Sequence, residues 1–220
     1  EEGNFYATGS FSGSVNIEHK VLQSSEKEGF IMKVNEKGES VFLKKFRSEN
    51  SKNASISAVG NIVISKKGNL ILVASQKCHS ADFLSNNSNT EIEELLLFET
   101  DKNGNYRSEK SIIKNIPDRS VMTVNQIENG DYFVSCRSLN SSKIQGNDYF
   151  FEEKGQALII RLNQNFEVQT IIQPNNYLDG AFRVGQTWKD KVFYSGHFRG
   201  EFSMGIFSVK SGVGHNLFLL

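Results

Sequence analysis

The sequence of 220 residues predicts an all-β fold made of repeated antiparallel sheets. One strand pattern returns about every 60 to 65 residues, which is the mark of a repeat architecture. Turn residues separate short apolar runs, and no stretch has the 3.6-residue periodicity of an amphipathic helix. The chain also has only two prolines, so few positions exclude a strand.

The clearest strand of each repeat combines aromatic or aliphatic residues with small ones. Its four copies are residues 4–9, 69–75, 131–136 and 191–196. A turn containing Gly, Asn or Asp precedes each copy, and these residue types tolerate the positive φ of a tight hairpin.

Further strands complete each repeat. The next strands are expected at 29–34, 95–99, 157–162 and 216–219, then at 41–43, 106–113 and 168–172, and the strands before the turns at 55–65, 120–127 and 181–187. Four short strands joined mostly by hairpins form an antiparallel meander, and a sheet that is apolar on both faces has to stack on its neighbours. The sequence therefore predicts the blades of a β-propeller.

The residues also carry a resemblance to a known family. The segments NFYATGSFSGSVNI, GFIMKVNEKGES, VFLKKF and SISAVGNIVISKKGNLILVAS resemble the SBBP-type repeats of bacterial β-propellers, which are akin to NHL blades. The resemblance covers nearly all of the chain. It implies a secreted or cell-surface protein, and it implies that residues 55–65, 120–127 and 181–187 line a central channel.

The expected domain organisation is a single β-propeller segment over residues 1–220. It would hold a partial blade at 4–47, complete blades at 55–114 and 120–173, and a partial blade at 181–220. Because a propeller closes with about four to eight blades, the chain is expected to be part of a longer one. The alternative is closure by a second copy or an unusual compact arrangement.

The connections fall into two classes, and the long ones share one rim of the blades. They are residues 10–28, 76–93, 137–156 and 197–215, together with 47–54, 114–119 and 174–180. The opposite rim carries only tight turns. Since binding residues concentrate on loops held by a rigid scaffold, a partner is expected at the long-loop rim.

Polar residues recur near the predicted channel mouth. Asn53, Asp118 and Asp179 lie at matching places ahead of the inner strands, and Arg119, Arg137, Tyr177 and Arg183 are expected nearby. One interpretation is a polar funnel that binds a sugar, a peptide or an ion. The other is that these side chains only satisfy loop N–H groups, as Asx turns do.

Three sequons, which begin at Asn53, Asn86 and Asn140, lie in the long connections and would be glycosylation sites in a secreted chain. The chain opens without a signal-peptide pattern, so either it is cytosolic or such a peptide has been removed. Its first residue, Glu1, favours a mature chain or an excised piece.

Composition argues against several function classes. Lys plus Arg and Asp plus Glu both number 25, so no basic stripe predicts nucleic-acid binding. Apolar runs such as 94–98 are far shorter than the roughly 20 residues of a membrane span. We therefore expect neither a nucleic-acid partner nor a membrane span.

No metal, cofactor or catalytic residue is expected. The two cysteines, Cys78 and Cys136, match no zinc spacing, and the four histidines have no ligand spacing. Residues 101–105 place oxygen ligands before Gly as calcium loops do, but they lack the later bidentate Glu. Cys78 and His79 are adjacent, so they point different ways and have no third orienting group.

The predicted function is a non-enzymatic scaffold or binding module of an extracellular or cell-surface protein, with the periplasm as an alternative. It would contact a protein or glycan partner through the long-loop rim, and the remaining blades or another copy of the chain would be further partners. One alternative is a purely structural assembly unit of a larger complex or filament. Another is a hydrolase or lyase, which would need titratable residues around Asp118 and Asp179.

Overall fold

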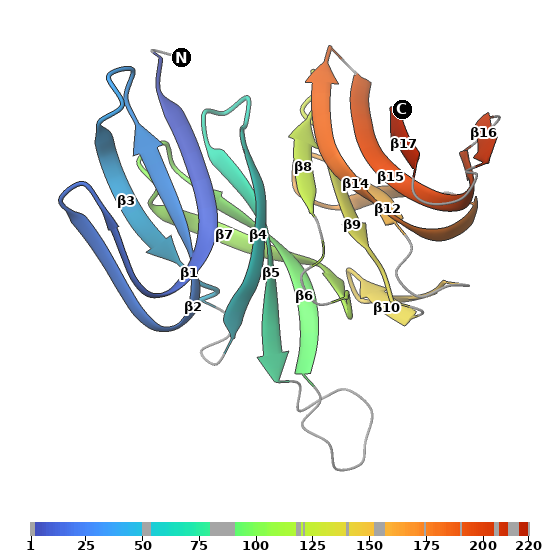
Figure 1. The fold of residues 1–220 in the computed structure, drawn as a ribbon, viewed down its shortest axis with the longest axis horizontal. Helices are drawn as coiled ribbons and strands as arrows, with labels where there is room; N and C mark the ends of the chain where they lie inside the picture. Colours follow the sequence, from blue (N-terminus) through green and yellow to red (C-terminus); the bar gives the residue numbers. More distant parts are fainter. Residues whose placement is uncertain are drawn as a thin grey trace. The chain divides into compact units, whose positions relative to one another are not determined.

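The computed structural model describes residues 3–49, 54–79, 91–117, 120, 122–139, 141–151, 157–173, 175–189, 191–204, 207–210 and 216–219. Over these ranges the chain is all-β: antiparallel strands form four sheets, and there is no helix (Figure 1). The predicted all-β antiparallel class is confirmed. Within the same ranges, no helix is long and apolar enough to span a membrane.

The chain divides into two compact units, Glu1–Ser111 and Ile112–Leu220, which are described separately. The first unit holds the sheet β1-β2-β3 and most of a six-stranded sheet of order β11-β10-β7-β6-β5-β4. Its strands are β1 (Phe5–Ile17), β2 (Lys20–Val34), β3 (Ser40–Phe46), β4 (Ser55–Ile64), β5 (Leu70–His79), β6 (Glu91–Thr100) and β7 (Tyr106–Lys114). The end of β7 and the strands β10 (Ser141–Ile144) and β11 (Asn147–Phe150) of the six-stranded sheet belong to the second unit.

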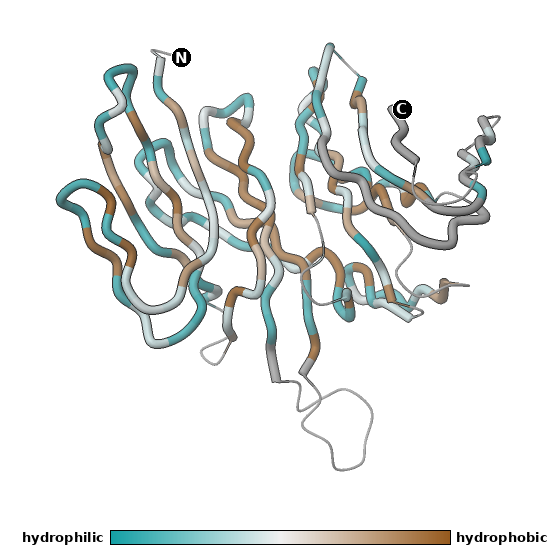
Figure 2. Tube along the Cα trace, in the orientation of Figure 1, coloured by the Kyte–Doolittle hydropathy of each residue, from teal (hydrophilic) through white to brown (hydrophobic). Residues whose placement is uncertain are grey.

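The core of the first unit lies between these two sheets. Alternate residues of β5 and β6 point to one face of their sheet, and there Leu72, Ala74 and Phe98 pack with Ile31 and Phe46 of the facing sheet. The rings of Phe46 and Phe98 lie 5.0 Å apart. The intervening residues Ile71, Val73, Leu95 and Leu97 are buried as well, so 70–74 and 95–98 are apolar on both faces. Figure 2 shows the hydrophobic colour along part of both strands.

The second unit holds two further sheets. The first has the order β13-β12-β9-β8, and its strands are β8 (Thr123–Gln126), β9 (Tyr132–Arg137), β12 (Ala157–Leu162) and β13 (Val168–Ile172). The second has the order β14-β15-β16, and its strands are β14 (Asn175–Trp188), β15 (Lys191–Met204) and β16 (Phe207–Lys210). A further strand, β17 (Asn216–Leu219), also pairs with β15. Ala157 and Ile159 pack against Tyr194 and Phe198 in the core between these two sheets.

Several segments expected to be loops are strands. Residues 10–28 continue β1 and β2 as one long hairpin with an irregularity between Phe11 and Gly13, residues 175–180 belong to β14, and residues 197–204 continue β15. Their Ser-, Gly- and Asn-rich composition is typical of loops, but main-chain pairing does not require apolar side chains. The loop assignment at these places is therefore wrong.

Polar contacts hold the far end of the β1–β2 hairpin beside β3, toward which it curves in Figure 1. The Ser40 N–H donates to the Glu18 carboxylate at 3.1 Å. Lys20 Nζ donates to the Ser40 carbonyl, and Lys45 Nζ donates to the Gln23 carbonyl at 3.4 Å. These contacts explain why the extension needs so few apolar residues.

Five turns share one geometry: residues 35–39, 65–69, 101–105, 127–131 and 163–167. In each, the first N–H donates to the fifth carbonyl, and the fourth N–H donates to the first carbonyl. The fourth residue has a positive φ; it is Gly in four turns and Phe166, with φ 58°, in the fifth. Glycine suits this conformation because it has no Cβ, so these turns explain the Gly signals of the sequence.

Candidate functional site

Three of the seven predicted funnel residues lie outside the described residues. Asn53, Asp118 and Arg119 fall there, as do the sequon residues Asn86 and Asn140. For Tyr177, Asp179 and Arg183 only the backbone is described, and it lies in β14 rather than in a connection: Tyr177 pairs with Gly200 and Asp179 with Arg199. Arg137 ends β9, half-buried, and pairs with Ala157. The polar funnel therefore stays a prediction.

One long connection contains a folded element that could present a binding surface. Between β9 and β12, residues 137–156 include the hairpin of β10 (Ser141–Ile144) and β11 (Asn147–Phe150). Gln145 and Gly146 form its turn with φ values of 45° and 89°, which is the type I′ turn that matches strand twist. The expectation of an irregular loop here is wrong, and the signal that could have found the hairpin is Gln-Gly between two short strand-like runs.

The β10 side of the hairpin is anchored. Ile113 and Lys114, at the end of β7, pair with Ile144 and Lys143. The Ser142 hydroxyl donates to the Asn115 carbonyl at 3.0 Å. Ser142 and Ile144 are buried, so β10 is fixed through both backbone and side chains.

The tip of the hairpin is anchored through the side-chain amide of Gln145. Its Oε1 accepts the Val168 N–H at 3.0 Å, and its Nε2 donates to the Phe166 carbonyl. The Gln145 N–H donates to the Ile112 carbonyl at 3.1 Å. Held at its base and its tip, the hairpin is a preorganised element.

The β11 strand faces outward from this anchored frame. Among the described residues it pairs only with β10, and the Phe150 side chain is 84% exposed. In a hairpin with a two-residue turn, the residues that flank the turn, here Ile144 and Asn147, form a backbone hydrogen-bonded pair. Hydrogen-bonded and non-hydrogen-bonded pairs alternate, so the next pair, Lys143 and Asp148, makes no backbone hydrogen bond across the hairpin. The N–H and C=O of Asp148 therefore point away from β10 and offer an edge for another strand.

The first unit has a polar hollow of about 530 Å³ near the end of β3. The buried Glu28 carboxylate in its lining pairs with Lys45 Nζ at 3.0 Å, and Glu109 accepts the Glu49 N–H at 3.2 Å. Burial, together with the negative charges of Glu109 and Glu49, raises the pKa of the Tyr106 phenol. The lining of the hollow carries two cations, Lys45 and Arg47, and two acids, Glu28 and Glu49, so its charges balance and it selects no charge class.

A buried carboxylate in the first unit serves its own sheet. Glu93 of β6 accepts the Ser75 hydroxyl at 2.6 Å and the hydroxyl of Ser57, and the two hydroxyl oxygens lie 2.7 Å apart. The three residues cross β4, β5 and β6 in a row. Buried polar groups need hydrogen-bond partners, and Ser57, Ser75 and Glu93 supply them to one another within the sheet.

Two of the residues considered for metal or nucleophilic chemistry, Asp101 and Cys136, have structural roles, whereas the side chains of Cys78 and His79 lie outside the described part of the structure. Asp101 Oδ1 accepts the N–H groups of Asn103 and Asn105, at 2.8 and 2.9 Å, so its oxygens close the turn. Burial raises the pKa of the Cys136 thiol to about 12, which keeps it protonated and a poor nucleophile. In the part of the chain that the structure describes, no three His, Cys, Asp or Glu side chains gather as metal ligands would.

Comparison with protein-family models gives no match, and comparison with curated proteins gives no significantly similar one.

Proposed function

We propose that the chain is a non-enzymatic binding module, a segment of a β-propeller in an extracellular or cell-surface protein, that takes a protein partner on the β10–β11 hairpin. The propeller part of this proposal is supported by the strand order. The strands β1-β2-β3 and β4 to β7 follow the chain as meanders, although β10 and β11 extend the second sheet to six strands and β9 pairs directly with β12. The central strands of β4 to β7 have buried apolar residues on both faces. Blades of a propeller combine these two properties.

The observation that carries the binding role is Phe150, a large apolar side chain held in water at the edge of an anchored hairpin. A partner strand laid along β11 would cover the ring and pair with the outward N–H and C=O of Asp148. Such β-strand addition gives affinity through the backbone and specificity through side-chain contacts. Because the frame is already ordered, binding would lose little conformational entropy.

The experiment that tests this role places a photo-crosslinking amino acid at position 150 of the protein as secreted or displayed by its source cells. A matched control carries the same group at Val21, which is also exposed but lies on the β1–β2 hairpin. A discrete crosslinked protein at position 150 and none at position 21 is expected. The same pattern at both positions, or no adduct at position 150, would contradict the proposal.

A second variant tests the edge itself. Asp148→Pro removes the outward N–H, while the bonds between β10 and β11 are made by the neighbouring pairs. The adduct at position 150 should fall at least tenfold with an unchanged melting temperature. If Asp148→Pro unfolds the protein, N-methylation of the Asp148 amide by chemical ligation removes the same donor, and undiminished crosslinking in that protein would overturn strand addition.

A further inference from the structure

We propose a second binding site, for an anionic sugar, in a hollow on the tight-turn side of the first unit. The hollow has a volume of about 670 Å³ and lies where the start of β1 meets the turns 65–69 and 101–105. The side chains that give it its character are Tyr6, Lys33, Lys67, Lys102 and Arg107, with Asn4 and Asn69 among the other lining residues. It is separate from the β10–β11 hairpin, which lies in the second unit.

The lining carries a surplus of positive charge although the whole chain is neutral. The lining holds four cations and one carboxylate, that of Asp101, which leaves three positive charges in surplus. The carboxylate accepts hydrogen bonds from its own turn and also interacts with the charge of Arg107. Glu99, beside the lining, accepts Asn69 Nδ2 at 2.5 Å and the Ser108 hydroxyl at 3.1 Å. Another acid, Glu36, contacts Gly3, the residue before the lining residue Asn4. A hollow lined by one sign of charge concentrates ligands of the opposite sign.

Tyr6 positions two of the cations. Its hydroxyl donates to the Lys102 carbonyl at 3.2 Å, which fixes the turn 101–105 against β1. The Lys33 ammonium lies 5.7 Å from the centroid of the Tyr6 ring, within the range of a cation–π contact. The two lysines are therefore brought to one place by a single aromatic residue.

The shared turn geometry positions a third cation. Lys67 is the third residue of its turn and Lys102 the second residue of its own. These positions carry Glu and Lys in the turn 35–39, Glu and Asn in the turn 127–131, and Gln and Asn in the turn 163–167. Among the five turns, only 65–69 and 101–105 have a cation and no acid at the second and third positions. Their sequences there are Lys-Lys followed by Gly, and Lys-Asn followed by Gly.

The ligand class follows from the rest of the lining. The amides of Asn4 and Asn103 suit hydroxyl groups, because an amide both donates and accepts. Ammonium and guanidinium groups suit sulfate or carboxylate substituents. Apolar side chains are few in this lining, so a peptide would gain little from burial there. A sulfated or carboxylated sugar satisfies both kinds of group.

The experiment titrates the protein with a sulfated disaccharide and, in parallel, with its unsulfated form, with hexaglutamate and with inorganic sulfate, followed by NMR or calorimetry. Binding of the sulfated disaccharide alone, weakened by added salt, is expected. Equal binding of the unsulfated sugar, or binding of hexaglutamate or sulfate as tight as that of the sulfated sugar, would overturn the proposal, as would no binding.

Variants locate the site. Lys67→Glu with Lys102→Glu should lower the affinity for the sulfated disaccharide at least tenfold, because both residues are exposed and lie in the hollow. The matched control for Lys67→Glu alone is Lys37→Glu, the same charge change at the third position of the turn 35–39, and it should change the affinity less than twofold. Equal losses would overturn the assignment. If the double variant is unstable, Lys67→Gln with Lys102→Gln makes the same test with a smaller expected loss.

Discussion

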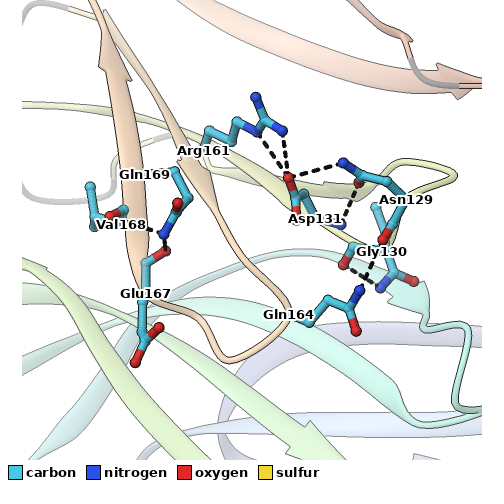
Figure 3. A network of polar contacts seen from close by, with 9 residues as sticks. Asn129, Gly130, Asp131, Arg161, Gln164, Glu167, Val168 and Gln169 are labelled. Carbon is cyan, nitrogen blue, oxygen red and sulfur yellow. Dashed lines mark hydrogen bonds and ion pairs between the residues drawn. The ribbon is translucent and has the colours of Figure 1, made fainter.

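The guanidinium of Arg161 donates two hydrogen bonds to one carboxylate oxygen of Asp131, from Nε at 3.0 Å and from Nη2 at 2.6 Å (Figure 3). Asn129 Nδ2 donates to the same oxygen at 3.1 Å, and Gln164 Nε2 donates to the Asn129 carbonyl at 2.9 Å. Arg161 is in β12, whereas Asp131 ends the turn before β9. The network therefore ties the turns 127–131 and 163–167 to each other and to their strands.

Removing this ion pair should weaken the second unit measurably. Arg161→Leu is expected to lower the free energy of unfolding by about 1 kcal/mol. An ion pair with charge-assisted hydrogen bonds and one largely buried partner stabilises the fold more than a fully exposed ion pair does. The Asp131 side chain is 15% exposed and that of Arg161 is 41% exposed. Urea unfolding of the single variants and of Arg161→Leu with Asp131→Asn gives the coupling energy.

The control for this prediction is the pair of Lys143 and Asp148, whose charged atoms lie 3.6 Å apart and whose carboxylate partner is 67% exposed. Its coupling energy should be below about 0.5 kcal/mol. A coupling for Arg161 and Asp131 no larger than that of the control would show that the bidentate geometry adds nothing to stability.

The strands could be predicted where turn chemistry and apolar runs agreed. Residues 69–75 and 95–99 have both signals, and they lie in β5 and β6. The antiparallel class followed because Asn- and Gly-containing turns of this length connect adjacent strands. These are local signals, so a single sequence was enough.

The long hairpins and the candidate sites could not be predicted in this way. Residues 10–28 pair through the backbone and through polar contacts such as that of Glu18 with Ser40, which leave no apolar alternation to detect. The hollow joins Tyr6 to a turn nearly a hundred residues away. The packing of one sheet on another creates that contact, and no local pattern encodes it.

Phe166 offers a test of the shared turn geometry. It occupies the left-handed position that Gly fills in the other four turns, at a cost of about 1–2 kcal/mol for a residue with a Cβ. Its ring is 9% exposed and lies 5.0 Å from that of Tyr132. Both Phe166→Ala and Phe166→Gly should destabilise the protein, by about 3 kcal/mol for the Ala variant.

The order of these two variants is the sharper prediction. Phe166→Gly should be more stable than Phe166→Ala by about 1 kcal/mol. Both variants lose the packing of the ring, but only Gly removes the strain of a positive φ, because it has no Cβ. This reverses the usual order inside a strand. Gly68→Ala is the backbone control: it has a φ of +76° and open space around the added methyl. Denaturant unfolding measures all three, and an Ala variant as stable as the Gly variant would contradict the shared geometry.

Protonation of Asp101, which closes the turn 101–105, should lower the stability of the first unit at acid pH. The backbone N–H of Asn105 is the main cause that lowers the pKa of this carboxyl below its ordinary value of 3.8. Desolvation opposes it, and the Asn105 side chain, the Asn103 N–H and the charge of Arg107 lower the pKa further. Because the folded pKa is the lower one, the stabilisation is complete above the unfolded pKa of about 3.8–3.9 and is lost as pH falls through the folded pKa.

The variant Asp101→Asn removes this titration and should keep the fold. Asn35 and Asn163 occupy the same place in their turns and accept the same two N–H groups, so stability at neutral pH should change little. As pH falls below about 4, the variant should lose stability less steeply than the natural chain. Side-chain carbonyl NMR of Asp101 measures its pKa directly. A value at or above 3.8, or parallel acid-unfolding curves for the two proteins, would show that the turn does not hold the carboxylate as its geometry indicates.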